Sequence, residues 1–123
     1  MDLKYYFYFY LHNYGNHTRD FTYIKDVTEI INRFIYFNNR KKHEIFNICS
    51  NRTIKLNKIL TIFNIFTKIS KIKKVGFHKA DILKTHGSNF KIIKSLKFKK
   101  FTNIKKGLIN AFNWYNNYLN KKL

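Results

Sequence analysis

The chain has 123 residues, 45% of them hydrophobic, and its 13 Phe and nine Tyr residues supply enough apolar surface for one modest domain and argue against disorder. The formal net charge is +19, and 21 of the 25 basic residues are Lys. Pro is absent and the favoured residues have A- and T-rich codons, so compositional drift explains the lysines without a polyanionic partner. Four arginines and no basic motif argue against a nucleic-acid-binding protein, which remains the alternative.

A single cysteine, Cys49, excludes an internal disulfide and a multi-cysteine zinc site, and it suits a reducing, cytoplasmic location. The apolar run at residues 5–11 is shorter than the roughly 20 residues that a membrane span needs. Asp2 stands where a signal peptide requires positive charge. We therefore expect a cytoplasmic protein without a membrane segment.

In the first part of the chain, the bulky aromatic residues 7–11 predict a buried strand, which Asn and Gly close with a turn at residues 13–16. Residues 21–24 suit a short extended stretch. A helix is then expected to begin at Asp26, which favours the positive helix end. Its apolar face is Val27, Ile30, Ile31 and Phe34.

After a polar loop at residues 38–42, alternation at residues 43–48 predicts a second strand, with Ile45 on the opposite side from Phe46 and Ile48. The clearest helix follows, with Asn57 as its predicted cap. One apolar stripe of this helix contains Leu56, Ile59, Leu60, Phe63, Phe66 and Ile69.

The last part of the chain is predicted to hold a short strand at residues 72–77 and two helices, one capped by Ser88 and ending at Leu96, the other preceded by Thr102. The apolar face of the last helix is Ile104, Leu108, Ala111, Phe112, Tyr115 and Leu119. Short strands mixed with about four helices predict an α/β or α+β-like fold; a helical bundle is the weaker alternative.

The segment that begins at Arg19, RDFTYIKDV, resembles the RDFTYIDD signature of the NAD-dependent epimerase/dehydratase family, which is part of the extended short-chain dehydrogenases/reductases. UDP-glucuronate 4-epimerases are the most similar subgroup. Four other segments resemble that family in the same order: NYG at 13–15, EIFNI at 44–48, KADI at 79–82, and GL at 107–108 followed by WY at 114–115 and Tyr118. Departures from the family include Cys49 and Ala80, both in place of glycine.

The resemblance implies that Arg19 contacts the diphosphate of a UDP-sugar and that Asp81 lies near the nucleotide ribose. A guanidinium fork matches a diphosphate better than a lysine point charge does, and a carboxylate accepts hydrogen bonds from ribose hydroxyls. Arg19 as a surface residue or as an ion-pair partner of Asp20 is the alternative interpretation. For Asp81 the alternative is a turn or cap residue. Asp20, Tyr23 and Asp26 are expected to support the fold.

No catalytic, NAD-binding or metal residue is predicted in this chain. Any two of the four glycines are more than ten residues apart in the sequence, so no dinucleotide-binding loop can form. Tyr118 and Lys122 have the family's Tyr/Lys spacing, but this spacing is expected by chance among nine tyrosines and 21 lysines. Cys49 near His43 lacks an oxyanion hole, and the five histidines lack metal-ligand spacing.

We therefore expect residues 1–123 to be a single partial domain, the carboxy-terminal nucleotide-sugar-binding lobe of such an epimerase or dehydratase, with no complete Rossmann sheet. By the resemblance, NAD and the catalytic Tyr/Lys belong to an amino-terminal Rossmann half, so the lobe alone is expected to be inactive. A separate Rossmann chain or self-association is the expected partner, because isolation of the lobe exposes apolar surface.

Overall fold

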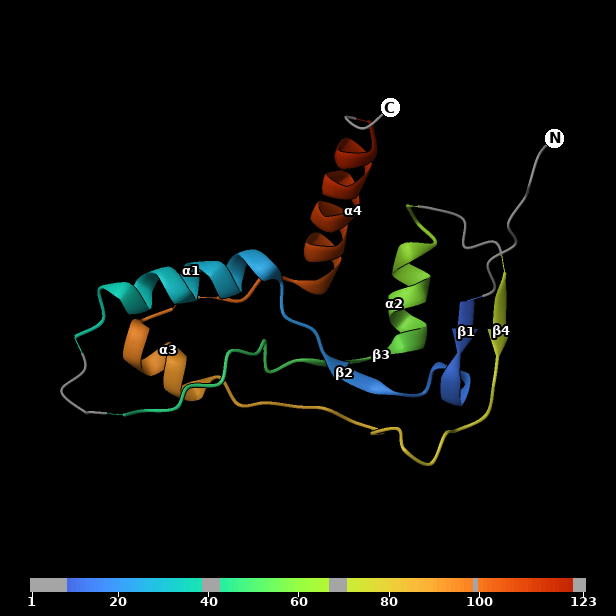
Figure 1. Cartoon of the computed structure of the whole chain (residues 1–123), viewed down its shortest axis with the longest axis horizontal. Coiled ribbons are helices and arrows are strands. Elements are labelled where there is room, and N and C mark those ends of the chain that lie inside the picture. Colours follow the sequence, from blue (N-terminus) through green and yellow to red (C-terminus); the bar gives the residue numbers. More distant parts are fainter. Residues whose placement is uncertain (1–8, 39–42, 67–70, 99, 121–123) are drawn as a thin grey trace. The chain divides into compact units, whose positions relative to one another are not determined.

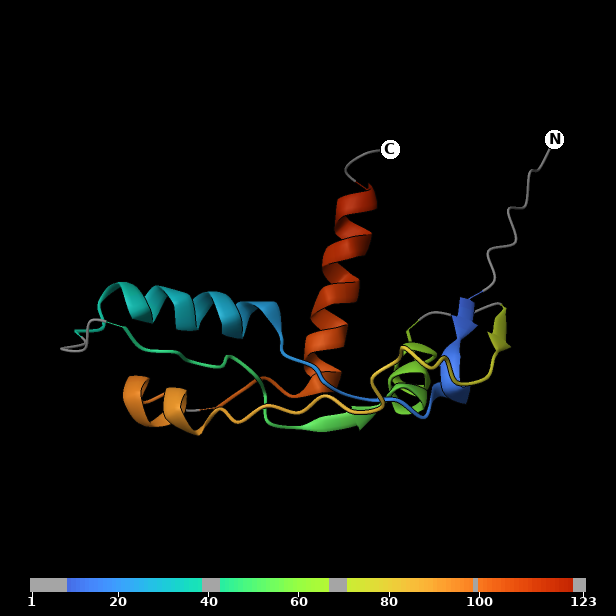
Figure 2. The same cartoon turned by 60° about the horizontal axis from the view of Figure 1, so that its bottom comes forward.

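The computed structural model of the chain describes residues 9–38, 43–66, 71–98 and 100–120 (Figures 1 and 2). These residues form four α-helices, one 3-10 helix and four short strands, which confirms the predicted mixed fold. The chain divides into two compact units. Unit 1 comprises Met1–Arg19 and Ile54–Thr85, and unit 2 comprises Asp20–Thr53 and His86–Leu123.

Unit 1 is built on a pair of parallel strands that are distant in sequence. Strand β1 (Phe9–Leu11) pairs with β4 (Ile72–Lys74), and the register aligns Leu11 with Lys74. The strand predicted at residues 7–11 is present over Phe9–Leu11, but Phe9 and Tyr10 are exposed and not buried as predicted. The strand predicted at residues 72–77 is present over Ile72–Lys74, and residues 75–77 are not part of it. Helix α2 (Leu56–Phe63) accompanies the pair, and its buried Ile59 and the buried Leu11 belong to the small core of this unit.

A tight turn, the 3-10 segment η1 (His12–Gly15), follows β1 as predicted. Three consecutive residues have positive φ, 47° at Asn13, 52° at Tyr14 and 77° at Gly15, of which only glycine adopts this conformation without cost. The amide of Asn57 donates from Nδ2 to the carbonyl of Tyr14 at 2.9 Å. Asn57 therefore stabilises this turn and does not cap α2, where the prediction placed it.

Two further strands, β2 (Thr18–Asp20) and β3 (Thr53–Lys55), form the second two-stranded sheet, and two of the three boundaries between the units fall within them. Residues 21–23, predicted as part of an extended stretch, have no regular structure, and helix α1 begins at Ile24.

The core of unit 2 joins helix α1 (Ile24–Ile35) to helix α3 (Phe90–Leu96), which lies beside it in both views (Figures 1 and 2). Its buried members are Ile30, Ile92, Phe98 and Phe101. Arg33 strengthens the junction, because its Nη1 donates to the carbonyl of Leu96 at 3.2 Å and its guanidinium lies 5.3 Å from the centre of the Phe98 ring.

The predicted strand at residues 43–48 is wrong, since the structure assigns no strand there. The predicted sides of the chain nevertheless hold: Phe46 and Ile48 pack on the core of unit 2, and Ile45 is 71% exposed. Alternating burial therefore arises from packing on a helical core, without a hydrogen-bonded ladder.

The helix starts predicted at Asp26, Ser88 and Thr102 are wrong as well. Helix α1 starts before Asp26, and the buried Asp26 carboxylate accepts hydrogen bonds from Thr102, from the backbone N–H at 2.7 Å and from the hydroxyl at 2.7 Å. Asn89, not Ser88, precedes the first residue of α3. Asn103 caps the last helix, since its Oδ1 accepts the N–H of Lys105 at 2.9 Å.

Helix α4 (Ile104–Asn120) contacts the rest of unit 2 near its start, where Gly107 packs against the ring of Tyr23. Beyond these first turns the helix projects away from α1 and α3 in both views (Figures 1 and 2). Trp114 is 65% exposed and Tyr115 53%, although the sequence places Tyr115 on the apolar face of this helix. No helix in the described ranges has the length and apolarity that a bilayer crossing requires.

Candidate functional site

The two residues that the sequence singled out, Arg19 and Asp81, both lie in unit 1, where backbone pairing joins their segments. Thr18 forms an isolated parallel bridge with Lys84. Two hydrogen bonds hold this bridge: the Thr18 N–H donates to the carbonyl of Leu83 at 2.9 Å, and the Thr85 N–H donates to the carbonyl of Thr18 at 3.1 Å. Residues 17–19 and 81–85 therefore form one local structure.

The guanidinium of the half-buried Arg19 lies over this bridge. Its Nη1 donates to the carbonyl of Thr18 at 3.0 Å and to that of Leu83 at 3.3 Å. In the part of the chain that the structure describes, Arg19 has no carboxylate partner, so it does not form the ion pair that was the alternative interpretation. The positive charge of this side chain is held in place by carbonyl groups and remains available to an anion.

Asp81 lies two residues before the carbonyl that Arg19 contacts. Its backbone N–H donates to the carbonyl of His78 at 2.9 Å and closes a turn, as the alternative interpretation of this residue expected. The carboxylate takes no part in that turn. It is 37% exposed, and its Oδ2 lies 3.7 Å from Nε2 of the buried His17. The site roles of Arg19 and Asp81 remain predictions; the structure brings their segments together.

His17 is the residue that sequence reasoning missed. The five histidines were considered as metal ligands, and His43 also as a partner of Cys49, so His17 was given no other role. The described residues contain no group of three His, Cys, Asp or Glu side chains suited to a metal ion. The available signal was the spacing of two between His17 and Arg19, which places both residues on the same side of an extended segment.

Cys49, in unit 2, does not have the properties of a nucleophile. Burial and the Asp20 carboxylate raise the pKa of its thiol, against a smaller lowering by a backbone hydrogen bond from Asn51. The sulfur is instead a packing partner of Gly87, where an added Cβ would lie 2.7 Å from Sγ. The cysteine that replaces the family's glycine therefore fits because a glycine stands opposite it.

The remaining glycines do not form a cradle for NAD. Gly15 packs against the side chain of Asn57, Gly107 against Tyr23, and Gly76 faces open space. A dinucleotide pyrophosphate requires a glycine-rich turn that opens a helix, and no two glycines of the sequence are close enough to build one. These residues do not fit NAD.

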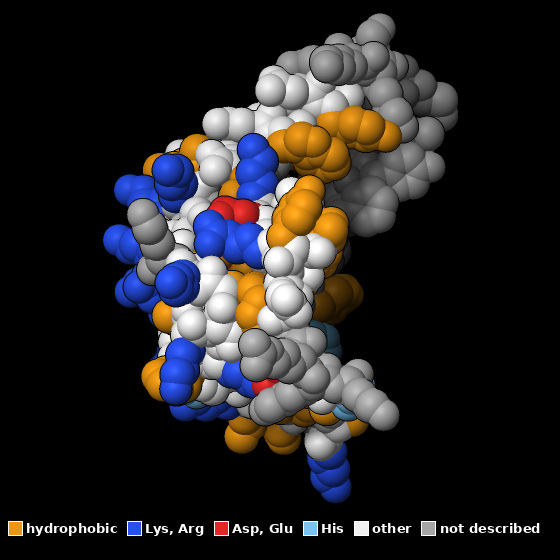
Figure 3. Space-filling model, turned by 90° about the vertical axis from the view of Figure 1, so that its left-hand side faces the viewer, with side chains coloured by type: hydrophobic (Ala, Val, Ile, Leu, Met, Phe, Trp, Pro, Cys, Tyr) orange, Lys and Arg blue, Asp and Glu red, His pale blue; other side chains and the backbone are white. Residues whose placement is uncertain are grey.

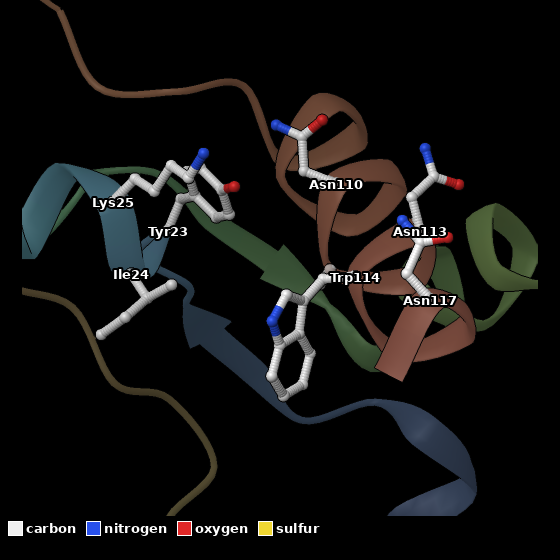
Figure 4. A pocket seen from close by; sticks show the side chains of 8 residues that line it. Tyr23, Ile24, Lys25, Asn110, Asn113, Trp114 and Asn117 are labelled. Atoms are coloured by element: carbon white, nitrogen blue, oxygen red, sulfur yellow. The ribbon is translucent and has the colours of Figure 1, made fainter. Parts of the chain in front are cut away.

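Unit 2 contains an apolar hollow of about 820 Å³ beside the exposed part of α4 (Figure 4). Figure 4 shows Tyr23 and Lys25 on one side of it and Trp114 on α4 on the other; Asn110, Asn113 and Asn117 of the same helix also line it. Its lining holds no carboxylate or histidine, and hence no acid–base pair. We interpret it as uncovered helix surface.

Lys and Arg side chains occur at many points of the face shown in Figure 3, and exposed hydrophobic side chains lie between them. This pattern agrees with lysines that coat a surface.

Sequence comparison finds two relatives that are longer than this chain. Uncharacterized protein MJ1055 of Methanocaldococcus jannaschii is 35% identical over 109 residues, which are 85% of this chain and 32% of that protein. Protein CapI of Staphylococcus aureus is 23% identical over 128 aligned residues, which cover 90% of this chain and 38% of CapI. The chain thus spans about a third of the length of these curated relatives. No protein-family model matches it.

Solved structures share the fold. MoeE5 in complex with UDP-glucose and NAD superposes with a TM-score of 0.81 at 18% identity, over 91% of this chain and 38% of MoeE5. UDP-glucose 4-epimerase of Thermotoga maritima gives 0.74 at 19% identity, over 90% and 35%. UDP-glucuronic acid 4-epimerase of Bacillus cereus gives 0.65 at 20% identity, over 80% and 31%.

The described residues therefore have the fold of the carboxy-terminal part of NAD-dependent nucleotide-sugar epimerases and dehydratases. The resemblance that begins at Arg19 is confirmed at the level of this fold.

Proposed function

We propose that this chain is the UDP-sugar-binding lobe of an epimerase like UDP-glucuronate 4-epimerase, with Arg19 on the diphosphate and Asp81 at the ribose. The observation that carries the proposal is the pairing of residues 18–19 with 83–85, which holds a guanidinium without a carboxylate partner in the described ranges next to the segment of a partly exposed carboxylate. The diphosphate of a nucleotide is bound by such a cation, and its ribose hydroxyls donate to such an acceptor.

Catalysis requires a Rossmann domain that carries NAD and the family's Tyr/Lys pair, because the residues of this chain form neither an NAD-binding turn nor such a pair. A separate Rossmann chain, or association of the lobe with itself, would also cover the apolar side chains now in solvent. Trp114, Tyr115 and the 70%-exposed Ile35 are among them. We expect the chain alone to leave UDP-glucuronate unchanged in the presence of NAD, as measured by anomeric NMR signals of the sugar.

Binding is tested by isothermal titration calorimetry of the chain with UDP and UDP-glucuronate. We expect Arg19→Ala to lower the affinity for both by about 10- to 100-fold, the usual effect of losing a charge-assisted pair. Arg19→Lys should recover part of the loss, because a lysine keeps the charge without the fork.

Arg52→Ala is the matched control, because Arg52 is an exposed arginine of unit 2 and its removal changes the net charge equally. It should change the affinity less than twofold. Equal losses in the two variants, or no binding of UDP by the unmodified chain at millimolar concentration, would overturn the proposal. Tight binding of single-stranded DNA that falls steeply with salt would instead support the nucleic-acid alternative.

A further inference from the structure

His17 is buried with a polar atom that lacks a partner. Its side chain is 3% exposed, and its Nε2 is fully enclosed without any hydrogen-bond partner in the described structure. Nearly all buried polar atoms in proteins are hydrogen-bonded, and an unpaired one costs about 1–3 kcal/mol. A residue that retains this cost needs an explanation outside the stability of the fold.

The contacts around His17 come from its backbone, from Phe77 and from Asp81. The His17 carbonyl accepts the N–H of Leu56 at 3.0 Å, at the start of α2, and the Phe77 ring lies 6.1 Å from the imidazole centre. The carboxylate of Asp81 faces this atom, with its Oδ2 3.7 Å from Nε2. A shift of well under 1 Å would bring these two atoms into hydrogen-bond distance.

Asp81 itself is held only on one side. Its backbone is fixed by the turn to His78, but the carboxylate is 37% exposed and has two oxygens. An aspartate at a surface turn samples several side-chain rotamers, and each rotamer lost on binding weakens the complex. A donor behind one oxygen would fix the rotamer and leave the other oxygen free to accept a hydroxyl.

We infer that His17 is a positioning residue: its Nε2–H holds the Asp81 carboxylate in the orientation that accepts the ribose hydroxyls. This inference rests on the proposed function, which assigns Asp81 to the ribose. His17 does not touch the ligand. It acts through Asp81, and its contribution should therefore appear in the recognition of the ribose hydroxyls and not in the recognition of the diphosphate.

The test compares UDP with 2′,3′-dideoxy-UDP by calorimetry in the full chain. His17→Phe keeps a ring of similar size and removes the donor. We expect it to lower the affinity for UDP about fivefold and to change the affinity for dideoxy-UDP less than twofold. His17→Gln, whose amide nitrogen can replace Nε2 as a donor, should restore most of the preference for UDP.

A merely structural His17 would weaken both nucleotides equally, and that result would overturn the inference. So would an undiminished preference for UDP in His17→Phe while Arg19→Ala still loses binding, and in that case the proposed function survives. Absence of UDP binding by the unmodified chain overturns both.

A second measurement does not depend on a variant that folds. Ring ¹⁵N shifts of His17 in the unmodified chain should place its proton on Nε2. A neutral ring with its proton on Nδ1 would rule out donation to Asp81 and overturn the inference.

Discussion

The two units use their polar side chains in opposite ways. In unit 2 the carboxylates complete the fold: Asp26 accepts two hydrogen bonds from Thr102, and Asp20 accepts the hydroxyl of Ser50 at 2.5 Å and its N–H at 3.2 Å. In unit 1 the Nε2 atom of His17 lies 3.7 Å from Oδ2 of Asp81 without a hydrogen bond, and Arg19 has no carboxylate partner in the described ranges. The boundary between the units falls between Arg19 and Asp20, inside the RDFTYI signature.

The comparison teaches that one short motif contains two kinds of residue. The carboxylates of Asp20 and Asp26 accept hydrogen bonds from backbone N–H and hydroxyl groups, so these two residues specify how unit 2 folds. Its arginine donates to the carbonyls of Thr18 and Leu83 and has no carboxylate partner in the described ranges. If this division is right, substitutions in unit 2 should lower stability, whereas substitutions at the candidate site should change binding with little loss of stability.

The largest effect is expected for Asp26→Ala. It leaves the N–H and the hydroxyl of Thr102 without their charged acceptor, in a buried place, and should lower the free energy of unfolding by about 3 kcal/mol. Urea unfolding, followed by the fluorescence of the single tryptophan, Trp114 in unit 2, measures this change. Glu29→Ala, an exposed residue on the same helix, is the control and should cost about 0.5 kcal/mol. Equal losses of unfolding free energy in Asp26→Ala and Glu29→Ala would contradict the structural role assigned to the carboxylates of unit 2.

Gly15→Ala tests whether unit 1 also has positions that matter for the fold. A Cβ at φ 77° is strained and would collide with the side chain of Asn57, so we expect a loss of about 2 kcal/mol in urea unfolding followed by circular dichroism. Gly76→Ala has open space around the new methyl group and should be nearly neutral. If the two variants unfold at the same urea concentration, the turn is not the constraint that its geometry indicates.

Gly87→Ala tests the packing of unit 2. The new methyl group meets Sγ of Cys49 at 2.7 Å, so we expect the substitution to lower the free energy of unfolding by about 1.5 kcal/mol, an ordinary overpacking cost. The double variant with Cys49→Ala removes the sulfur and should recover most of the loss. A double-mutant cycle by urea unfolding gives the coupling directly. Additive costs would show that the two residues do not pack as described.

The smallest effect on stability is expected at the candidate site. His17→Phe removes a buried nitrogen that has no partner and keeps the ring, so the free energy of unfolding should stay within about 1 kcal/mol of the original. A loss as large as that of Asp26→Ala, measured in the same way, would assign His17 to the fold and remove the contrast between the units.

Helical periodicity made much of this fold predictable. The apolar faces assigned to α1 and α2 contain the buried Ile30 and Ile59, and the strand expected at residues 72–77 is present as β4. The caps were not predictable, because Asn, Ser and Thr are so common in this chain that cap signals occur near every helix. The bond between Asp26 and Thr102 joins residues 76 positions apart, and local spacing cannot reveal it.

The candidate site was predictable in part. Arg19 stands out as one of four arginines and through the resemblance, and Asp81 through the resemblance alone. The sequence could not show that residues 18 and 84 pair, since this depends on the path of the chain. His17 was missed for a related reason: its meaning comes from burial next to Asp81, and burial of a polar residue has no simple sequence pattern.

The chain order of the two units has a consequence for how the protein acquires its structure. Each unit is made of two separate stretches that alternate along the chain, and β1 must wait for β4 about 60 residues later. Contacts of such sequence separation slow folding, because a long loop has to close before any strand pair forms. During synthesis neither unit is complete until the other has been partly translated. The two units are therefore interleaved along the sequence, and no single cut would separate one unit from the other.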